Sequence, residues 1–212
     1  MLSSSDHPDF SHEHFRHYHN RPTTFKQTIM ASLHALAIPP LIRGMQNIAA
    51  ILKRAQASDL DVATILTSRV HPTMRPFTSQ IKSLTDTATH IPSQINPSLP
   101  RSPLPDLEKN SSFDTLLSRI AAAVSHLEVI APEELNERED TKVKLRVDRR
   151  SWDGDVAYVE YVALEFVQMH AHANFWFHVT TAYNLLRAAG LEIGKPDFLN
   201  AAGLKTWEMW NE

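Results

Sequence analysis

The residues most suited to chemistry lie in the stretch "NFWFHVTTAYNLLR", residues 174–187. This stretch predicts a helix, and residues three or four apart in a helix share one face. Asn174, His178 and Thr181 therefore place an amide, an imidazole and a hydroxyl on the same side. Imidazole suits proton transfer because its unperturbed pKa lies near neutrality. We take His178, Asn174 and Thr181 as the candidate catalytic residues, with His178 as the general base.

Other kinds of site are excluded by what the sequence lacks. Without cysteine there is no disulfide, thiolate metal site or cysteine nucleophile. The chain also lacks a G-x-S-x-G elbow, a phosphate-binding loop and a dinucleotide-binding glycine pattern. A net charge of −3 argues against a nucleic-acid partner, which needs a strongly basic face. No apolar run approaches the roughly 18 residues of a membrane span, and the N-terminus lacks a secretory pattern, so we expect a cytoplasmic protein without membrane contact.

Four segments with helical apolar periodicity must position these side chains. They cover residues 39–57, with Pro39 and Pro40 at the start, and residues 72–89, 111–130 and 164–189. Residues 90–110 carry five prolines and predict a loop. Because 42% of the residues are hydrophobic and only five are glycine, the composition favours a mainly helical domain with a sizeable core.

A short β-hairpin is predicted between the third and fourth long helices. Residues 141–147 alternate between polar and apolar, and residues 156–162, "VAYVEYV", are rich in β-branched and aromatic side chains. The intervening "SWDGD" supplies a turn. Two strands alone are marginally stable, so we expect the hairpin to pack on the helices.

The two ends of the chain differ from its middle. Residues 1–29 are poor in apolar side chains and hold five of the twelve histidines, which predicts a disordered tail. We expect a single helical domain over residues 30–203, followed by a C-terminal tail over residues 204–212. The histidines of the first segment are His7, His12, His14, His17 and His19.

Three stretches resemble a known family. They are "SLHALAIPPLIRGMQNIAAILKRA", "SRVHPTMRPFTSQIKSLTDTA" and "NFWFHVTTAYNLLRAAGLEIGKPDFLN", in that order. Over about residues 31–200 the chain resembles the domain-of-unknown-function family 1993, part of the DinB/YfiT-like superfamily. The resemblance implies a DinB-like four-helix bundle, often dimeric, with a small antiparallel hairpin inserted before the last long helix.

The resemblance also implies a metal site. Better-known members of the superfamily bind a divalent metal through one histidine of the second helix and a His-x-x-x-His pair of the last. In this chain it points to His71, His170 and His178, with zinc or nickel as the ion. The chain departs from the pattern because Asn174 stands four residues before His178, and an amide is a poor ligand for these metals. We therefore expect a degenerate site that works without a cofactor, with a divalent metal as the alternative.

Three interpretations of the Asn174–His178 pair remain open. It belongs to a metal site, or to a metal-free polar pocket for a small-molecule ligand, or it is a hydrogen-bonded structural pair in a non-catalytic, dimeric interaction protein. For an enzyme, hydrolysis, isomerisation and group transfer are all open. Phe175, Trp176 and Phe177 point in directions about 100° apart, so they cannot all enter one core. Because aromatic side chains are enriched at interfaces, we expect a homodimer.

Overall fold

The computed structural model describes residues 31–101, 104, 107, 111–148 and 156–206. The chain divides into the units Met1–Met30 and Ala31–Glu212, and all described residues belong to the second. The predicted tail 1–29, the predicted hairpin turn 151–155 and residues 207–212 of the predicted C-terminal tail lie outside the described residues.

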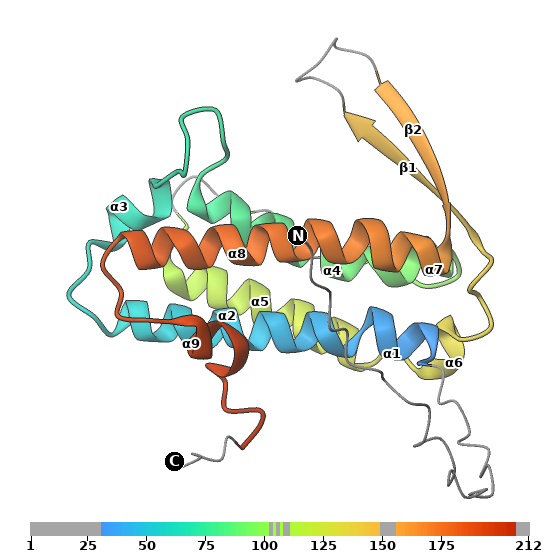
Figure 1. Cartoon of the computed structure of the whole chain (residues 1–212), viewed down its shortest axis with the longest axis horizontal. Coiled ribbons are helices and arrows are strands. Elements are labelled where there is room, and N and C mark those ends of the chain that lie inside the picture. Colours follow the sequence, from blue (N-terminus) through green and yellow to red (C-terminus); the bar gives the residue numbers. More distant parts are fainter. Residues whose placement is uncertain (1–30, 102–103, 105–106, 108–110, 149–155, 207–212) are drawn as a thin grey trace, which may run out of the picture. The chain divides into compact units, whose positions relative to one another are not determined.

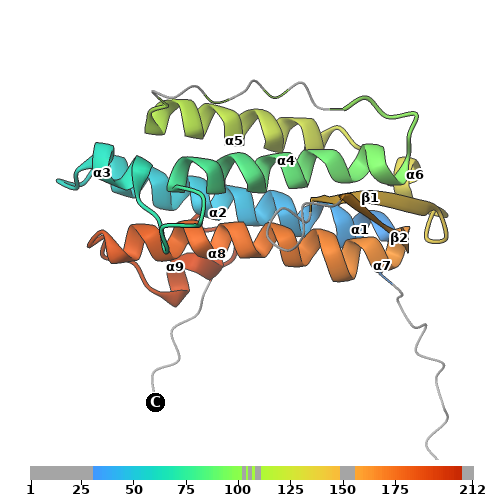
Figure 2. The same ribbon diagram turned by 90° about the horizontal axis from the view of Figure 1, so that it is seen from above.

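The second unit is a bundle of four long helices, α2 (Pro39–Gln56), α4 (Phe77–Ile95), α5 (Phe113–Glu128) and α8 (His172–Ala188). Each long helix packs against two others: α4 against α5 and α8, and α2 against α5 and α8. In Figure 1, α4 and α8 lie above α2 and α5, and Figure 2 shows the same helices side by side from above. The shorter helices are α1 (Leu33–Ala37), α3 (Val62–Thr67), α6 (Pro132–Leu135), α7 (Ala163–Glu165) and α9 (Lys195–Asn200), and a π-helix, η1, spans Phe166–Ala171.

Helix α2 begins where the sequence predicts. Pro39 and Pro40 occupy its first positions, where a missing N–H costs little. Leu41, Met45, Ile48 and Leu52 form its buried stripe. The expectation that no apolar run approaches the length of a membrane span was wrong, because the run Leu33–Gln56 is long and apolar enough to cross a membrane, by length and composition alone. Half of that window is buried in the bundle, as expected for the core helix of a packed domain.

Helix α4 corrects two boundaries predicted from the sequence. It begins at Phe77 rather than at residue 72, because Pro76 is extended (ψ 170°) and acts as the N-cap. It also continues to Ile95, through Pro92, into the segment predicted as a loop. Ile91 and Ile95 are fully buried and extend the apolar stripe of the helix. Their packing outweighs the hydrogen bond that Pro92 cannot donate.

The last long helix is one run in which α7, η1 and α8 follow each other without a break. A π-turn places an extra residue in the helix and is frequent at functional sites. Gly190 follows the end of α8 with φ at 100°, the left-handed conformation common after a helix C-terminus. The sequence therefore located both ends of this run, although it gave no sign of the π-turn.

The predicted hairpin is confirmed. Strands β1 (Lys142–Asp148) and β2 (Val156–Val162) pair antiparallel, with Lys142 opposite Val162. Val143 and Leu145 are buried, and β1 contacts α4. Figure 1 shows β2 running directly into α7. The hairpin thus rests on the bundle through one face of β1, as the instability of an isolated hairpin requires.

Candidate functional site

A polar cleft of about 300 Å³ lies between α4 and the η1–α8 run. Leu145 of the hairpin and Phe166 of η1 supply apolar parts of its lining. Its polar lining comes from Ser83, Asp86, Thr87, His90 and Gln94 on α4, Arg146 on β1, and His170, Asn174 and His178 on η1–α8.

The proton on His178 is placed by a relay of hydrogen bonds. The Nε2 group of Gln80 donates to the backbone carbonyl of Arg75 at 2.9 Å, which fixes the orientation of the Gln80 amide. Its Oε1 then faces Nδ1 of His178 at 2.7 Å, so Nδ1 carries the proton and donates. Among the described residues, Nε2 of His178 has no hydrogen-bond partner and retains its lone pair.

The charge state of His178 follows from its surroundings. Burial lowers the pKa of His178 below its usual 6.5, and the positive charge of Arg75 lowers it further. The imidazole is therefore neutral at neutral pH. A neutral ring with a free Nε2 can accept a hydrogen bond or a proton from a bound molecule.

Asn174 is held in a similar way. Its Nδ2 group donates to the hydroxyl of Thr87 at 2.7 Å, which leaves Oδ1 of Asn174 to accept. Gln80 faces His178 and Thr87 faces Asn174, so α4 and α8 run antiparallel along the cleft. Two acceptors, Oδ1 of Asn174 and Nε2 of His178, thus stand one helical turn apart on the α8 side.

His170 occupies the end of the cleft formed by η1. Its ring packs against two aromatic rings, with centroid distances of 5.9 Å to both Tyr161 and Phe166. This partial burial lowers the pKa of His170. The π-turn sets the position of His170 in the cleft, because an extra residue in the turn rotates the side chains that precede α8.

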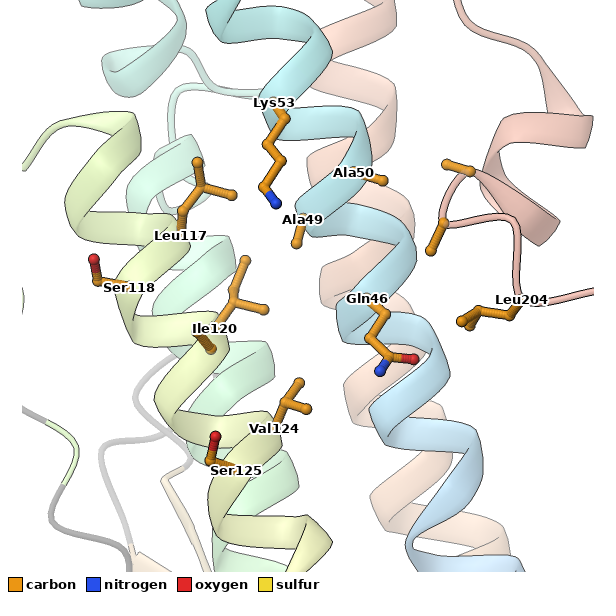
Figure 3. A pocket seen from close by; sticks show the side chains of 13 residues that line it. Gln46, Ala49, Ala50, Lys53, Leu117, Ser118, Ile120, Val124, Ser125 and Leu204 are labelled. Carbon is orange, nitrogen blue, oxygen red and sulfur yellow. The ribbon is translucent and has the colours of Figure 1, made fainter.

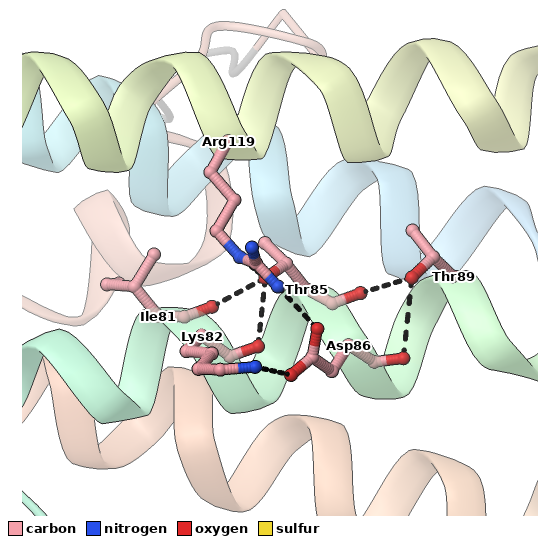
Figure 4. A network of polar contacts seen from close by, with 6 residues as sticks. All are labelled: Ile81, Lys82, Thr85, Asp86, Thr89 and Arg119. Carbon is pink, nitrogen blue, oxygen red and sulfur yellow. Dashed lines mark hydrogen bonds and ion pairs between the residues drawn. The ribbon is translucent and has the colours of Figure 1, made fainter. Parts of the chain in front are cut away.

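The carboxylate of the cleft belongs to a network that the sequence analysis missed (Figure 4). Asp86 pairs with Lys82 at 2.8 Å and with the guanidinium of Arg119, whose side chain is 1% exposed. Arg119 also donates through Nε to the hydroxyl of Thr85 at 2.8 Å. Two cations therefore hold Asp86 in place. An arginine within the apolar stripe of residues 113–127 was the available signal, since a charge on a buried face requires a partner.

The predicted site residues are only partly brought together. His170, Asn174 and His178 share the cleft, as their helical spacing indicates. His71 does not line it: this residue is exposed in the loop before α4, where its Nδ1 meets the hydroxyl of Thr73 at 2.9 Å. The Thr181 hydroxyl donates to the carbonyl of Phe177 at 2.7 Å and also lies outside the lining.

His90 is the α4 histidine of the cleft in place of His71. Because α4 and α8 are antiparallel, the C-terminal part of α4 lies beside the beginning of α8, where His170 stands. Desolvation lowers the pKa of His90; Asp86 opposes this shift and Arg101 adds to it. His71 precedes α4 and so belongs to the other end of the bundle.

The residues of the cleft do not fit a three-ligand metal site. Within the described part of the chain, no group of three or more histidine, aspartate or glutamate side chains is arranged to hold a metal ion. Tetrahedral zinc needs three protein ligands with bonds of about 2.1 Å to one point. His170 and His178 are two helical turns apart, and the position between them is the amide Asn174.

A second hollow is larger but carries less chemistry (Figure 3). It is an open groove of about 820 Å³ between α2 and α5, bordered by Ala201, Ala202 and Leu204 of the C-terminal segment. Its lining is mostly apolar, with Lys53 as its charged group, and it holds no acid or imidazole. The polar cleft is therefore the candidate functional site.

Comparison with known proteins identifies the family. The model of the domain of unknown function DUF1993 matches residues 33–199. The chain belongs to the DUF1993 family. A crystal structure of a DinB family member protein from Shewanella denitrificans is similar to this DUF1993 chain, with a TM-score of 0.64 and 26% identity over 82% of this chain and 95% of that one. The predicted DinB-like helical fold is thereby confirmed. A comparison with curated proteins found no match.

Proposed function

We propose that this DUF1993 protein binds a small polar molecule in the cleft between α4 and α8, with His178 as the general base. The observation that carries the proposal is the relay from the Arg75 carbonyl through Gln80 to Nδ1 of His178. The relay directs the free lone pair to Nε2, at a side chain that lines the cleft. Among the described residues the buried side-chain atom without a partner is Nε2 of His126, so the unpaired Nε2 of His178 is not sealed in the core and stays open to a molecule in the cleft.

The chemistry of the lining indicates the class of ligand. Nε2 of His178 and Oδ1 of Asn174 both accept hydrogen bonds, so a ligand should offer hydroxyl or amine hydrogens. The carboxylate of Asp86 is engaged by Lys82 and Arg119, so it is held in a fixed position in the cleft. A proton taken by His178 makes acid–base chemistry, in hydrolysis, isomerisation or group transfer, the reaction type.

Ligand-observed NMR with a panel of small hydroxyl- and amine-bearing metabolites tests this proposal. Compounds that bind in the cleft should lose affinity in His178→Gln and in Asn174→Ala. The control is His71→Gln, which changes an exposed imidazole outside the cleft. Circular dichroism establishes that each variant is folded. Compounds that bind both cleft variants as tightly as the wild type would place binding elsewhere and reject the proposal.

The second candidate is a non-catalytic, dimeric interaction protein in which the polar pair is structural. The observation that favours it is the exposure of Phe177 at 54%, beside His178 on α8. An exposed aromatic ring on a helix is typical of an interface. A protein that dimerises but yields no cleft ligand in the NMR panel would support this candidate over the first.

A further inference from the structure

The outward face of η1 and α8 carries no charged side chain before Arg187, near the end of α8. From Phe166 to Leu186 the sequence holds no aspartate, glutamate, lysine or arginine. Met169 and Phe177 are nevertheless 69% and 54% exposed. A solvent-facing helix normally bears charged side chains on its outer face, so this surface is unusual for one that stays in water.

The exposed residues form one stripe, which we call the α8 stripe. Its members follow each other at spacings of three or four residues, and the four from Ala173 onward lie in α8 and so share one side of that helix. Ala173 is small, so another backbone can approach closely at this point. The α8 stripe consists of Met169, Ala173, Phe177, Thr180 and Asn184, all exposed.

Two charges of opposite sign mark the ends of the α8 stripe. Glu165 precedes it and Arg187 follows it, and both are exposed. Arg187 donates to the backbone carbonyl of Leu191 at 3.1 Å and has a distant acidic partner in Glu192 at 3.7 Å, yet half of its side chain stays exposed and the Glu192 side chain is 95% exposed. The stripe is therefore acidic at one end, neutral along its length and basic at the other.

We propose that a second copy of this chain docks on the α8 stripe, with the two α8 helices antiparallel about a two-fold axis near Phe177. The order of residues is nearly symmetric about Phe177, so the two copies complement each other. Ala173 then faces Thr180 of the partner subunit, and Met169 faces Asn184 of the partner subunit. Glu165 approaches the partner subunit's Arg187 at both ends, which a parallel arrangement would not allow.

Other occupants fit this surface less well. An amphipathic helix that lies on a membrane carries lysine or arginine beside its apolar face, whereas the α8 stripe has none along its length and a glutamate at one end. A strongly charged partner would find no opposite charge over 21 residues. The opposite charges at the two ends of the α8 stripe, Glu165 and Arg187, complement those of a second copy and therefore favour that copy over the other occupants.

The proposed interface lies next to the polar cleft. His170, Asn174 and His178 each directly follow Met169, Ala173 and Phe177 in the sequence. The ring of Phe177 meets the ring of His178 edge-on, with a centroid distance of 5.2 Å. A second copy bound to the α8 stripe would therefore cover the α8 side of the cleft and shield His178 from water. This consequence for the cleft rests on the proposed function, whereas the docking itself does not.

Sedimentation velocity of the full chain over a range of concentrations tests the docking. We expect a reversible dimer whose dissociation constant rises about thirtyfold or more in Ala173→Arg and in Phe177→Glu, because each buries an unpaired charge at the centre. The matched control is Val129→Glu, an exposed apolar residue at the end of α5 that should leave the dimer intact. A wild-type chain that stays monomeric up to millimolar concentration would overturn the proposal, as would an Ala173→Arg protein that dimerises normally.

A charge exchange tests the antiparallel arrangement. Glu165→Lys should weaken the dimer by facing the partner subunit's Arg187, and the double variant Glu165→Lys/Arg187→Glu should restore it. A double variant that dimerises no more tightly than Glu165→Lys would reject this geometry.

A membrane is the alternative occupant of the stripe. If the wild-type protein is monomeric and binds phosphatidylcholine vesicles, and Phe177→Glu abolishes that binding, the stripe is assigned to a membrane instead. Loss of the dimer with intact ligand binding in the cleft would separate this inference from the proposed function.

Discussion

At the scale of single residues, the position of one proton on His178 decides what the cleft can do. The Gln80 relay places that proton on Nδ1. We expect the ¹⁵N spectrum of the imidazole ring at neutral pH to show a protonated Nδ1 and an unprotonated Nε2. In Gln80→Leu the acceptor is gone, so the ring should lose this fixed tautomer. A wild-type spectrum with the proton on Nε2 would contradict the relay.

The buried histidines make stability depend on pH. Burial lowers the folded-state pKa of His170 and His178 below 6.5, and that of His126 as well, where Nε2 is buried without a partner among the described residues. The unfolded chain therefore binds protons more readily, and the free energy of unfolding should fall as the pH drops below about 6.5, by at most about 1.4 kcal/mol per pH unit for each group.

Urea unfolding of the wild type and His178→Gln across this pH range measures the effect. The stability of both proteins should be level above about pH 7.5, where the imidazoles are neutral in both states. The wild type should lose more stability on acidification than His178→Gln does. Parallel curves for the two proteins would show that His178 does not contribute.

Arg119 is the buried charge with the largest expected effect on stability. Its guanidinium pairs with Asp86, and Arg119→Met would leave that partly exposed carboxylate with Lys82 as its cation partner and would remove the donor to the Thr85 hydroxyl (Figure 4). We expect a loss of about 1–3 kcal/mol in the free energy of unfolding, because hydrogen bonds to a charged group are lost but Asp86 keeps one cation and contact with solvent. The double variant Arg119→Met/Asp86→Leu should recover part of this loss, because neither charge of the Arg119–Asp86 pair remains. A fully additive double variant would show that the pair is not coupled.

At the scale of elements, the contact between α2 and α8 depends on Gly44. A methyl group at Gly44 would lie 2.7 Å from Cε1 of Phe175 and 2.9 Å from Cη2 of Trp176. We expect Gly44→Ala to lower the free energy of unfolding by about 1–3 kcal/mol through overpacking, despite the better helix propensity of alanine. Phe175→Leu should relieve the clash, so the double variant should be more stable than additivity allows. A neutral Gly44→Ala would mean that the two helices can move apart.

The helices and strands were largely predictable from the sequence, whereas the residues of α4 that lie beside η1 and α8 were not. Apolar periodicity located all four long helices, and alternation located the hairpin. Periodicity does not give the end of a helix that runs through a proline, so α4 was placed too early and Pro92 was taken as part of a loop. Because of that error, His71 was expected to be the histidine that this helix contributes to the site, whereas His90 lines the cleft. Within one helix, by contrast, spacing placed Asn174 and His178 together correctly, although Thr181, which was grouped with them, lies outside the lining of the cleft.

At the scale of the whole molecule, the metal content of the protein separates the remaining interpretations. The cleft offers His90, His170 and His178 without a three-ligand arrangement among the described residues, so we expect no stoichiometric zinc or nickel there. The five histidines before residue 20 can bind metal loosely, so they must be replaced by glutamine in an otherwise full-length chain. Elemental analysis after incubation with zinc or nickel and desalting should then find well below one equivalent. Close to one equivalent, lost in His178→Ala but kept in His71→Ala, would show instead that the cleft side chains rearrange around an ion. The acid–base role of His178 would then give way to metal ligation, because the Nε2 lone pair cannot serve both.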